Sequence, residues 1–162
     1  MGEEPSAAGE WHVVRTRAGA EDKAAIGIEK AGMEAFLPVE LIRTSCRGNR
    51  LQPGGVMWQP LFMGHLLVRF DLGRDLRRVC EIYGVDDVVR LNGKVVPVAD
   101  AAVRALRSSE RAGLFDAALG CRVPDDDAPA PDVRYAGLMA RIKTSRGSRK
   151  RAAILMELLL SQ

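Results

Sequence analysis

The chain has 162 residues, of which 47% are hydrophobic and 28% charged, and its net charge is +3. A chain of this length buries roughly two thirds of its unfolded surface, so we expect one main domain with an appendage. Residues 1–10 lack a basic region followed by an apolar stretch, and no apolar run approaches the ~18 residues of a membrane span. The composition therefore favours a cytoplasmic protein over a secreted or membrane protein.

The first part of the chain predicts a strand, a helix and a second strand. Residues 11–17 are typical of a strand, and 20–31 of a helix with acidic residues in its first turn. Gly32 is well placed as the left-handed residue that ends this helix. Residues 33–42 predict the second strand, but Pro38 cannot donate to a strand ladder and indicates an edge or a bulge.

Two further segments, 56–62 and 65–71, predict a hairpin-like pair bent at Gly64. Side chains of the second segment alternate, so that one face carries Leu66, Val68 and Phe70 and the other His65, Leu67 and Arg69. We expect the first face to join the core. The second mixes apolar and polar groups, as a docking surface requires.

The remaining elements complete an α+β pattern. A helix is predicted over 72–83, then two strands, 85–91 and 94–98, joined by the hairpin turn Asn92-Gly93, and a third helix from Asp100. This order predicts an α+β fold in which helices flank an antiparallel sheet.

The last third of the chain changes in character. Residues 108–131 are rich in glycine, proline and aspartate and predict a linker. Residues 132–162 carry seven basic and two acidic side chains and are too short for an independent core. Such a basic tail either binds nucleic acid or simply keeps a turn soluble, and the sequence leaves both readings open.

Nothing in the sequence predicts catalysis, a metal or a cofactor. Cys46, Cys80 and Cys121 are far apart, and His12 and His65 are the only histidines. The chain has neither a phosphate-cradling glycine loop nor a nucleophile with a recognisable base. We therefore expect a protein that is not an enzyme, with no metal site and no cofactor.

Several short segments, in a fixed order and spacing, resemble one family. They are Trp11 to Arg15, Phe36-Leu37-Pro38, Pro60-Leu61-Phe62, Gly64, Leu66 to Phe70, Gly84-Val85 and Pro97-Val98. Together they resemble the N-terminal domain of the NusG/RfaH transcription elongation and antitermination factors. The resemblance implies a flexible N-terminus at 1–10, a NusG N-terminal-like domain at 11–107, a linker at 108–131 and a tail at 132–162.

The resemblance also implies a partner. In this family an apolar face binds the clamp helices of RNA polymerase and another edge approaches the gate loop, which suppresses pausing or termination. Carried over by position, the clamp-helix candidates are Arg15, Phe62, His65, Leu67 and Val88, and the gate-loop side lies near Arg74 and Asp75.

The candidate face departs from the family pattern. The family usually has proline and tyrosine where Met63 and His65 stand, and aromatic residues where Leu67 and Val88 stand. A less aromatic face implies either lower affinity or a different partner surface. The alternative is that Phe62 and Leu67 simply fill the core.

Basic residues add two alternative functions. Arg17 and Lys23 lie on the side that family members present to non-template DNA, and Arg43, Arg47 and Arg50 surround an expected hairpin tip. These are the candidate DNA contacts, and they allow a nucleic-acid-binding module that acts through the basic hairpin and tail. A ribosome-linked adaptor, which contacts ribosomal protein or Rho, is the other alternative.

The tail has two alternatives of its own. It resembles the middle of a KOW domain, a small barrel, but it stops where the closing strand should begin and would expose an unpaired edge. That truncation argues against a ribosomal or Rho contact. In the RfaH branch the corresponding tail can form a helical hairpin that covers the clamp-binding face and autoinhibits it. The apolar residues Leu138, Met139, Ile142, Leu155, Leu158 and Leu159 suit helix faces, but Arg149, Lys150 and Arg151 are unfavourable at the amino terminus of the second helix. The balance is slightly on the side of the hairpin, because helices satisfy their own backbone groups while a truncated barrel loses its closing ladder.

Overall fold

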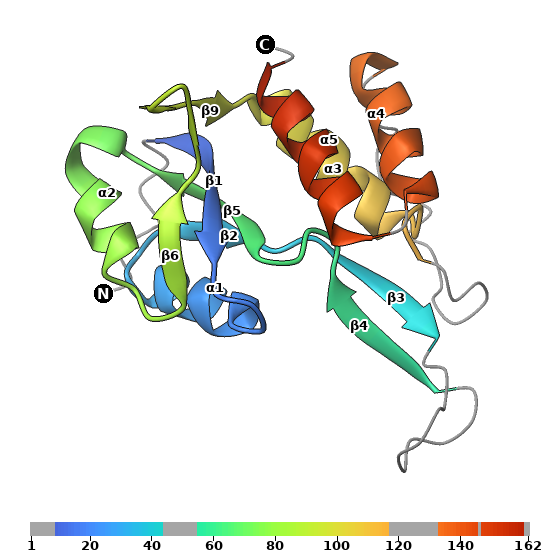
Figure 1. The fold of residues 1–162 in the computed structure, drawn as a ribbon, viewed down its shortest axis with the longest axis horizontal. Helices are drawn as coiled ribbons and strands as arrows, with labels where there is room; N and C mark the ends of the chain where they lie inside the picture. The colour runs from blue at the N-terminus through green and yellow to red at the C-terminus, as the bar shows by residue number, and fades with distance from the viewer. Residues whose placement is uncertain (1–8, 44–54, 117–132, 146, 161–162) are drawn as a thin grey trace.

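The computed structural model describes residues 9–43, 55–116, 133–145 and 147–160 (Figure 1). The strands are β1 (Glu10–Thr16), β2 (Glu34–Phe36), β3 (Val39–Arg43), β4 (Val56–Pro60), β5 (His65–Phe70), β6 (Val85–Val88), β7 (Arg90–Leu91), β8 (Lys94–Val95) and β9 (Pro97–Val98). The helices are α1 (Glu21–Lys30), α2 (Leu72–Cys80), α3 (Asp100–Arg111), α4 (Val133–Thr144) and α5 (Ser148–Leu160). The predicted α+β fold, with helices flanking an antiparallel sheet, is confirmed.

The main sheet is built around β1. Its strand order is β2-β5-β1-β6, and β9 also pairs with β1. The β1–β5 register runs from Glu10 opposite Phe70 to Arg15 opposite His65. Strand β1 takes the central place because its residues 11–14 are all buried, so that both of its faces meet apolar neighbours.

Helices cover both faces of this sheet and create two cores. On one face α1 contributes Ala24 and Ile28 and α2 contributes Val79 to a cluster that includes Val14 of β1. On the other face the cluster draws side chains from α3, α4 and α5 onto the sheet. Figure 1 shows α3, α4 and α5 grouped together, away from α1 and α2.

Two predictions about strand pairing are wrong. The predicted strand 33–42 is divided at residues 37–38, so that β2 pairs with β5 while β3 leaves the main sheet and pairs with β4. Segments 56–62 and 65–71 therefore do not form a hairpin together. Pro38 lacks an N–H and cannot continue the ladder, and its carbonyl accepts a bond from the Leu61 N–H at 2.8 Å. By contrast, the Asn92-Gly93 turn joins β7 to β8 as predicted.

The folded domain extends beyond its predicted limits. Helix α3 continues to Arg111 and Phe115 is buried in the core, so the predicted linker 108–131 begins too early. The reason is structural, because Glu110 and Asp116 accept hydrogen bonds from backbone N–H groups of β3, at Val39 and Leu41. At the other end, Glu10 already belongs to β1, and residues 1–8 and 117–132 lie outside the described part.

The tail is a helical hairpin. Helices α4 and α5 together form what we call the tail hairpin, and no strand occurs in the described residues of the tail. The truncated KOW-like alternative is therefore not the arrangement in this structure. In each helix the hydrogen-bonded backbone is satisfied within the element, which a barrel lacking its closing strand cannot achieve.

A buried histidine makes the stability of the domain sensitive to pH. His12 of β1 is buried against the Phe70 ring, with 4.6 Å between ring centroids, and burial lowers its pKa. Below about pH 6.5 the unfolded chain takes up a proton that the folded chain resists, so the free energy of unfolding falls as the pH drops. We expect urea unfolding to show this decline, and His12→Phe to flatten it. His65→Phe is the control and should keep the decline. A decline in His12→Phe equal to that of the native chain would mean that His12 is not its cause.

Candidate functional site

One face of the sheet carries an apolar surface that we call the covered face. It comprises Val13 of β1, Leu67 of β5, and Leu61 and Phe62 from the segment after β4, all at most 2% exposed. Val13 and Leu67 lie directly opposite each other in the β1–β5 register, so their side chains emerge on the same side. The alternation predicted for residues 65–70 is therefore present.

A tight turn fixes the position of Phe62 and His65. Gly64 has φ of +76°, a conformation that favours glycine. Its N–H donates to the carboxylate of the buried Glu21 at 2.8 Å, and its carbonyl accepts from the Thr16 N–H at 2.8 Å. The turn is thus tied to both α1 and the end of β1, which fixes its position beside the covered face.

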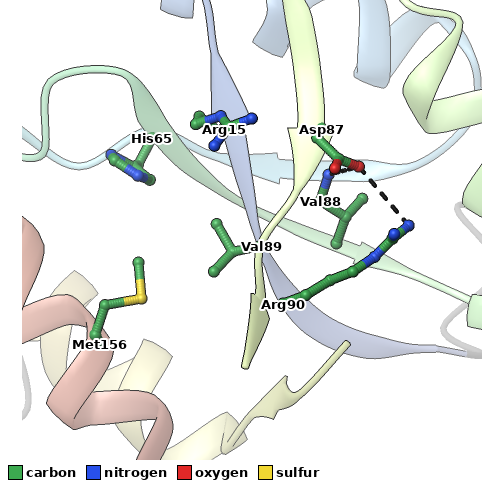
Figure 2. Close-up of a pocket in the computed structure, with 7 residues that line it drawn as sticks. All are labelled: Arg15, His65, Asp87, Val88, Val89, Arg90 and Met156. Atoms are coloured by element: carbon green, nitrogen blue, oxygen red, sulfur yellow. Dashed lines mark hydrogen bonds and ion pairs between the residues drawn. The ribbon is translucent and has the colours of Figure 1, made fainter. Parts of the chain in front are cut away.

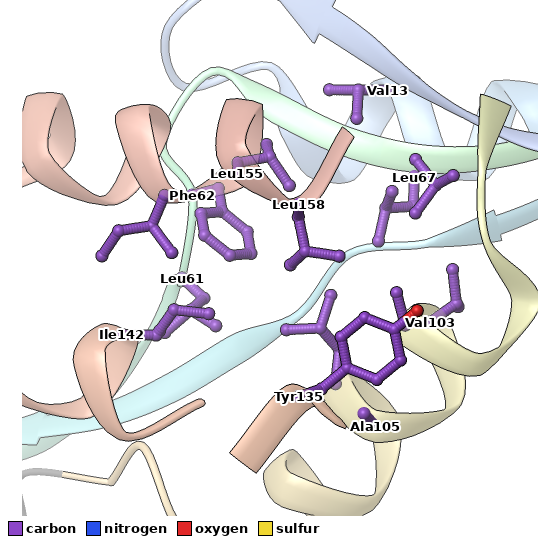
Figure 3. Packing of buried hydrophobic residues seen from close by; sticks show 14 of the residues in the cluster. Val13, Leu61, Phe62, Leu67, Val103, Ala105, Tyr135, Ile142, Leu155 and Leu158 are labelled. Atoms are coloured by element: carbon purple, nitrogen blue, oxygen red, sulfur yellow. The ribbon is translucent and has the colours of Figure 1, made fainter. Parts of the chain in front are cut away.

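The tail hairpin packs directly on the covered face. Figure 3 shows Leu155 and Leu158 of α5 beside Phe62, and Ile142 of α4 beside Leu61. The contacting residues of α5 recur at helical spacing along one side of the helix. Because both sets of side chains are buried in the same cluster, the tail and the sheet share one core.

A buried ion pair reinforces this packing. Arg151 of α5 pairs with Glu40 of β3, and their side chains are only 10% and 2% exposed. The Arg151 Nη2 donates to Glu40 Oε2 at 2.9 Å, and the Arg151 Nε donates to the Ser145 carbonyl at 3.0 Å. Gln59 Nε2 donates to Glu40 Oε1 at 2.7 Å. We call the Arg151–Glu40 contact the tail ion pair.

A second ion pair holds the two tail helices together. The Arg141 Nη2 of α4 donates to Glu157 Oε1 of α5 at 3.1 Å, and a second contact joins Nη1 to Oε2. The guanidinium lowers the pKa of Glu157 by hydrogen bonding to its carboxylate. Both groups are solvent-exposed, so this pair contributes far less than the buried one.

The covered face continues into an open pocket of about 330 Å³. Figure 2 shows the residues that line it, which are Arg15, His65, Asp87, Val88, Val89, Arg90 and Met156 of α5. Arg15 and His65 are cross-strand neighbours in the β1–β5 register. Arg15 Nε also pairs with Asp86 Oδ2 at 2.7 Å, which holds its side chain over the β6 edge.

Four of the five clamp-helix candidates lie on one face. Phe62 and Leu67 are under the tail hairpin, and Arg15 and His65 lie at its edge. Val88 lines the pocket beside Arg15 and His65, but it pairs with Val14 and its buried side chain packs in the opposite core with α1 and α2, so it is not part of the covered face. Its neighbour Val89 packs on the face with Phe62. A register shift between Arg15 and Thr16 makes this face assignment hard to read from the sequence.

Asp75, which the resemblance placed on the gate-loop side, is buried at the start of α2. Its side chain is 1% exposed and pairs with Arg74 at 2.9 Å and Arg78 at 2.8 Å. The hydrogen bond from Arg74 is the main cause of the lowered pKa of Asp75. Arg78 in turn donates to the Ala31 carbonyl, so this cluster joins α2 to the end of α1. Only Arg74 of the two gate-loop candidates is exposed.

The candidate DNA contacts that the structure describes are not gathered into one patch. Arg17 follows β1, Lys23 lies on α1 and Arg43 ends β3, and all three are exposed. In Figure 1, α1 and the outer end of β3 lie apart. Arg47 and Arg50 lie outside the described residues.

The tail ion pair was missed in the sequence. Glu40 is the acidic residue of the apolar segment Val39-Glu40-Leu41-Ile42, and a charge at such a position indicates a buried partner. That signal could have identified Glu40 but not its partner Arg151, which follows 111 residues later.

Neither a metal site nor a membrane span is found in the described residues. No group of at least three His, Cys, Asp or Glu side chains there could hold a metal ion. None of the described helices is both long enough and apolar enough to cross a bilayer.

Comparison with known proteins identifies the family. Residues 9–107 match the family described as "Transcription termination factor nusG". The chain belongs to the NusG family. No curated protein matches it. The NusG match ends within α3, so the tail hairpin lies outside it.

Solved structures include a NusG that resembles this NusG-family chain. It is described as "Domain interaction in Thermotoga maritima NusG", with 22% sequence identity and a TM-score of 0.44. The match covers 60% of this chain and 54% of that one, so the chain spans about half the length of the Thermotoga protein.

Proposed function

We propose that this NusG-family chain is a transcription elongation or antitermination factor that binds RNA polymerase in the cytoplasm and suppresses pausing or termination. Its covered face would bind the clamp helices of the polymerase. The observation that carries this proposal is that the covered face is already occupied by a helix, α5, from its own tail. A face that accepts one amphipathic helix has the apolar anchors needed to accept another.

We further propose that the closed chain is autoinhibited. The tail hairpin buries Phe62 and Leu67, so a clamp helix and α5 cannot occupy the covered face together. The partner must therefore bind a state in which the tail has undocked, and its apparent affinity is reduced by the rarity of that state. In the same arrangement Arg74 would face the gate loop, and Arg17 and Lys23 would contact DNA phosphates.

A pausing assay on the full chain tests both parts of the proposal. Leu155→Asp with Leu158→Asp places two charges in the buried contact and should undock the tail. We expect this variant to suppress pausing at a concentration ~10-fold lower than the native chain requires. Ala153→Asp, on the exposed side of α5, is the matched control and should behave as the native chain does.

The outcomes separate the alternatives. Equal activity of the native and undocked chains would argue against autoinhibition. If neither chain binds RNA polymerase, the proposed function is wrong. Binding to nucleic acid that falls steeply with salt and survives Phe62→Ala would instead support a nucleic-acid-binding module.

A further inference from the structure

We propose that Glu40 makes the covered face selective for a partner helix that carries a cationic side chain one turn before its apolar anchors. This inference rests on the proposed function and deepens it, because it specifies the chemistry of the partner. Apolar burial alone would accept many amphipathic helices. A carboxylate inside the apolar surface restricts that choice.

Glu40 lies at the border of the covered face. It lies opposite Gln59 in the β3–β4 register, and the next residue, Leu41, is buried. Gln59 donates one hydrogen bond to it from within the domain. Among the described residues, the charged partner of its carboxylate is Arg151 of the tail, which also reaches the Leu61 carbonyl at 3.4 Å. When the tail leaves, Glu40 therefore loses its charged partner.

A partner helix that replaces the tail also has to provide a cation for the buried Glu40 carboxylate. Arg151 contacts both Glu40 and the Leu61 carbonyl, so a helix that takes the place of α5 along Leu61 and Phe62 also covers the Glu40 carboxylate and excludes water from it. A buried carboxylate without a cation is strongly unfavourable, so a helix with only apolar and neutral side chains is penalised. A helix with arginine or lysine at the right place restores the pair and its hydrogen bonds.

The tail itself supplies the spacing. Arg151, Leu155 and Leu158 follow one another at i, i+4 and i+7, and all three are buried on the side of α5 that meets the sheet. The same pattern of one cation and two apolar anchors defines the partner helix. Selectivity then arises from rejection of unmatched helices as much as from attraction to the matched one.

The first test uses the full chain with the tail undocked by Leu155→Asp and Leu158→Asp. In that background Glu40 no longer serves the tail, so Glu40→Gln reports on the partner alone. We expect Glu40→Gln to weaken binding to RNA polymerase core enzyme by ~10-fold or more, and to reduce the salt dependence of that binding. Glu29→Gln makes the same charge change on the exposed side of α1 and should leave the affinity unchanged. An effect of Glu40→Gln no larger than that of Glu29→Gln would overturn the inference.

A second test needs no polymerase. A synthetic peptide with the α5 sequence is titrated into the undocked chain and compared with the same peptide carrying Arg151→Met. We expect the arginine peptide to bind ~10-fold more tightly, and this preference to vanish in the chain with Glu40→Gln. Equal binding of the two peptides would overturn the selectivity of Glu40. Peptide selectivity without any polymerase binding would instead show that the proposed function fails while the selective face remains.

Discussion

Replacing Arg151 with methionine should undock the tail hairpin. The substitution removes the cation from the tail ion pair and leaves the Glu40 carboxylate at 2% exposure without its charged partner. Breaking a buried ion pair by removing one member costs about 3–5 kcal/mol, more than the net contribution of most single contacts. We expect this loss to exceed the net free energy that docks the tail hairpin on the covered face. We therefore expect α5 amides to lose most of their protection from hydrogen exchange.

Two companion variants separate the ion pair from general effects of charge. Arg149→Met removes an exposed charge of the same helix and should leave exchange protection unchanged. Arg151→Met combined with Glu40→Met replaces both buried charges with apolar side chains, and such replacements are often neutral or stabilising. We expect the double variant to regain much of the protection. Native-like protection in Arg151→Met alone would mean that the apolar contacts suffice to dock the tail.

The opened chain should also be the more active one. If the tail hairpin blocks the covered face, Arg151→Met suppresses pausing at lower concentration than the native chain does. The double variant closes again and also lacks Glu40 on the covered face, so for both reasons it should need a higher concentration than Arg151→Met does. Activity that rises as exchange protection falls, from the native chain to Arg151→Met, would connect the ion pair to function.

The main domain could be predicted from the sequence because its signals are local. Alternation in residues 65–70 predicts which side chains share a face, and Gly32 and Asn92-Gly93 mark the ends of elements through their backbone preferences. The α+β class follows from the order of these elements. Each of these inferences needs only a short window of residues.

The errors arise where a distant segment decides the outcome. β4 pairs with β3 rather than β5. The chain leaves the main sheet at Pro38, after β2, and returns to it at Gly64, before β5. Val88 faces the opposite core because its partner on β1 is Val14. The buried state of Glu40 depends on Arg151, which is remote in sequence. No local pattern carries that information.

Truncating Phe62 should have two separable effects. Its ring is 2% exposed and belongs to the cluster that joins the sheet to the tail hairpin. Phe62→Ala should lower the free energy of unfolding by about 3–5 kcal/mol, because it removes a buried aromatic side chain and leaves a cavity. Met63→Ala is the control, since the adjacent side chain is 54% exposed and should change stability little. Urea unfolding of both variants measures the difference.

The same truncation should act on polymerase binding in two opposing ways. Loss of the ring loosens the tail, which favours the partner, and it also removes an anchor from the covered face, which disfavours the partner. In the chain with its native tail, these two effects on polymerase binding partly cancel. In the chain undocked by Leu155→Asp and Leu158→Asp only the anchor effect remains, and there Phe62→Ala should weaken binding by at least ~1 kcal/mol. Unchanged binding in that background would place the polymerase contact elsewhere on the molecule, and tail docking would then be the sole role of this ring.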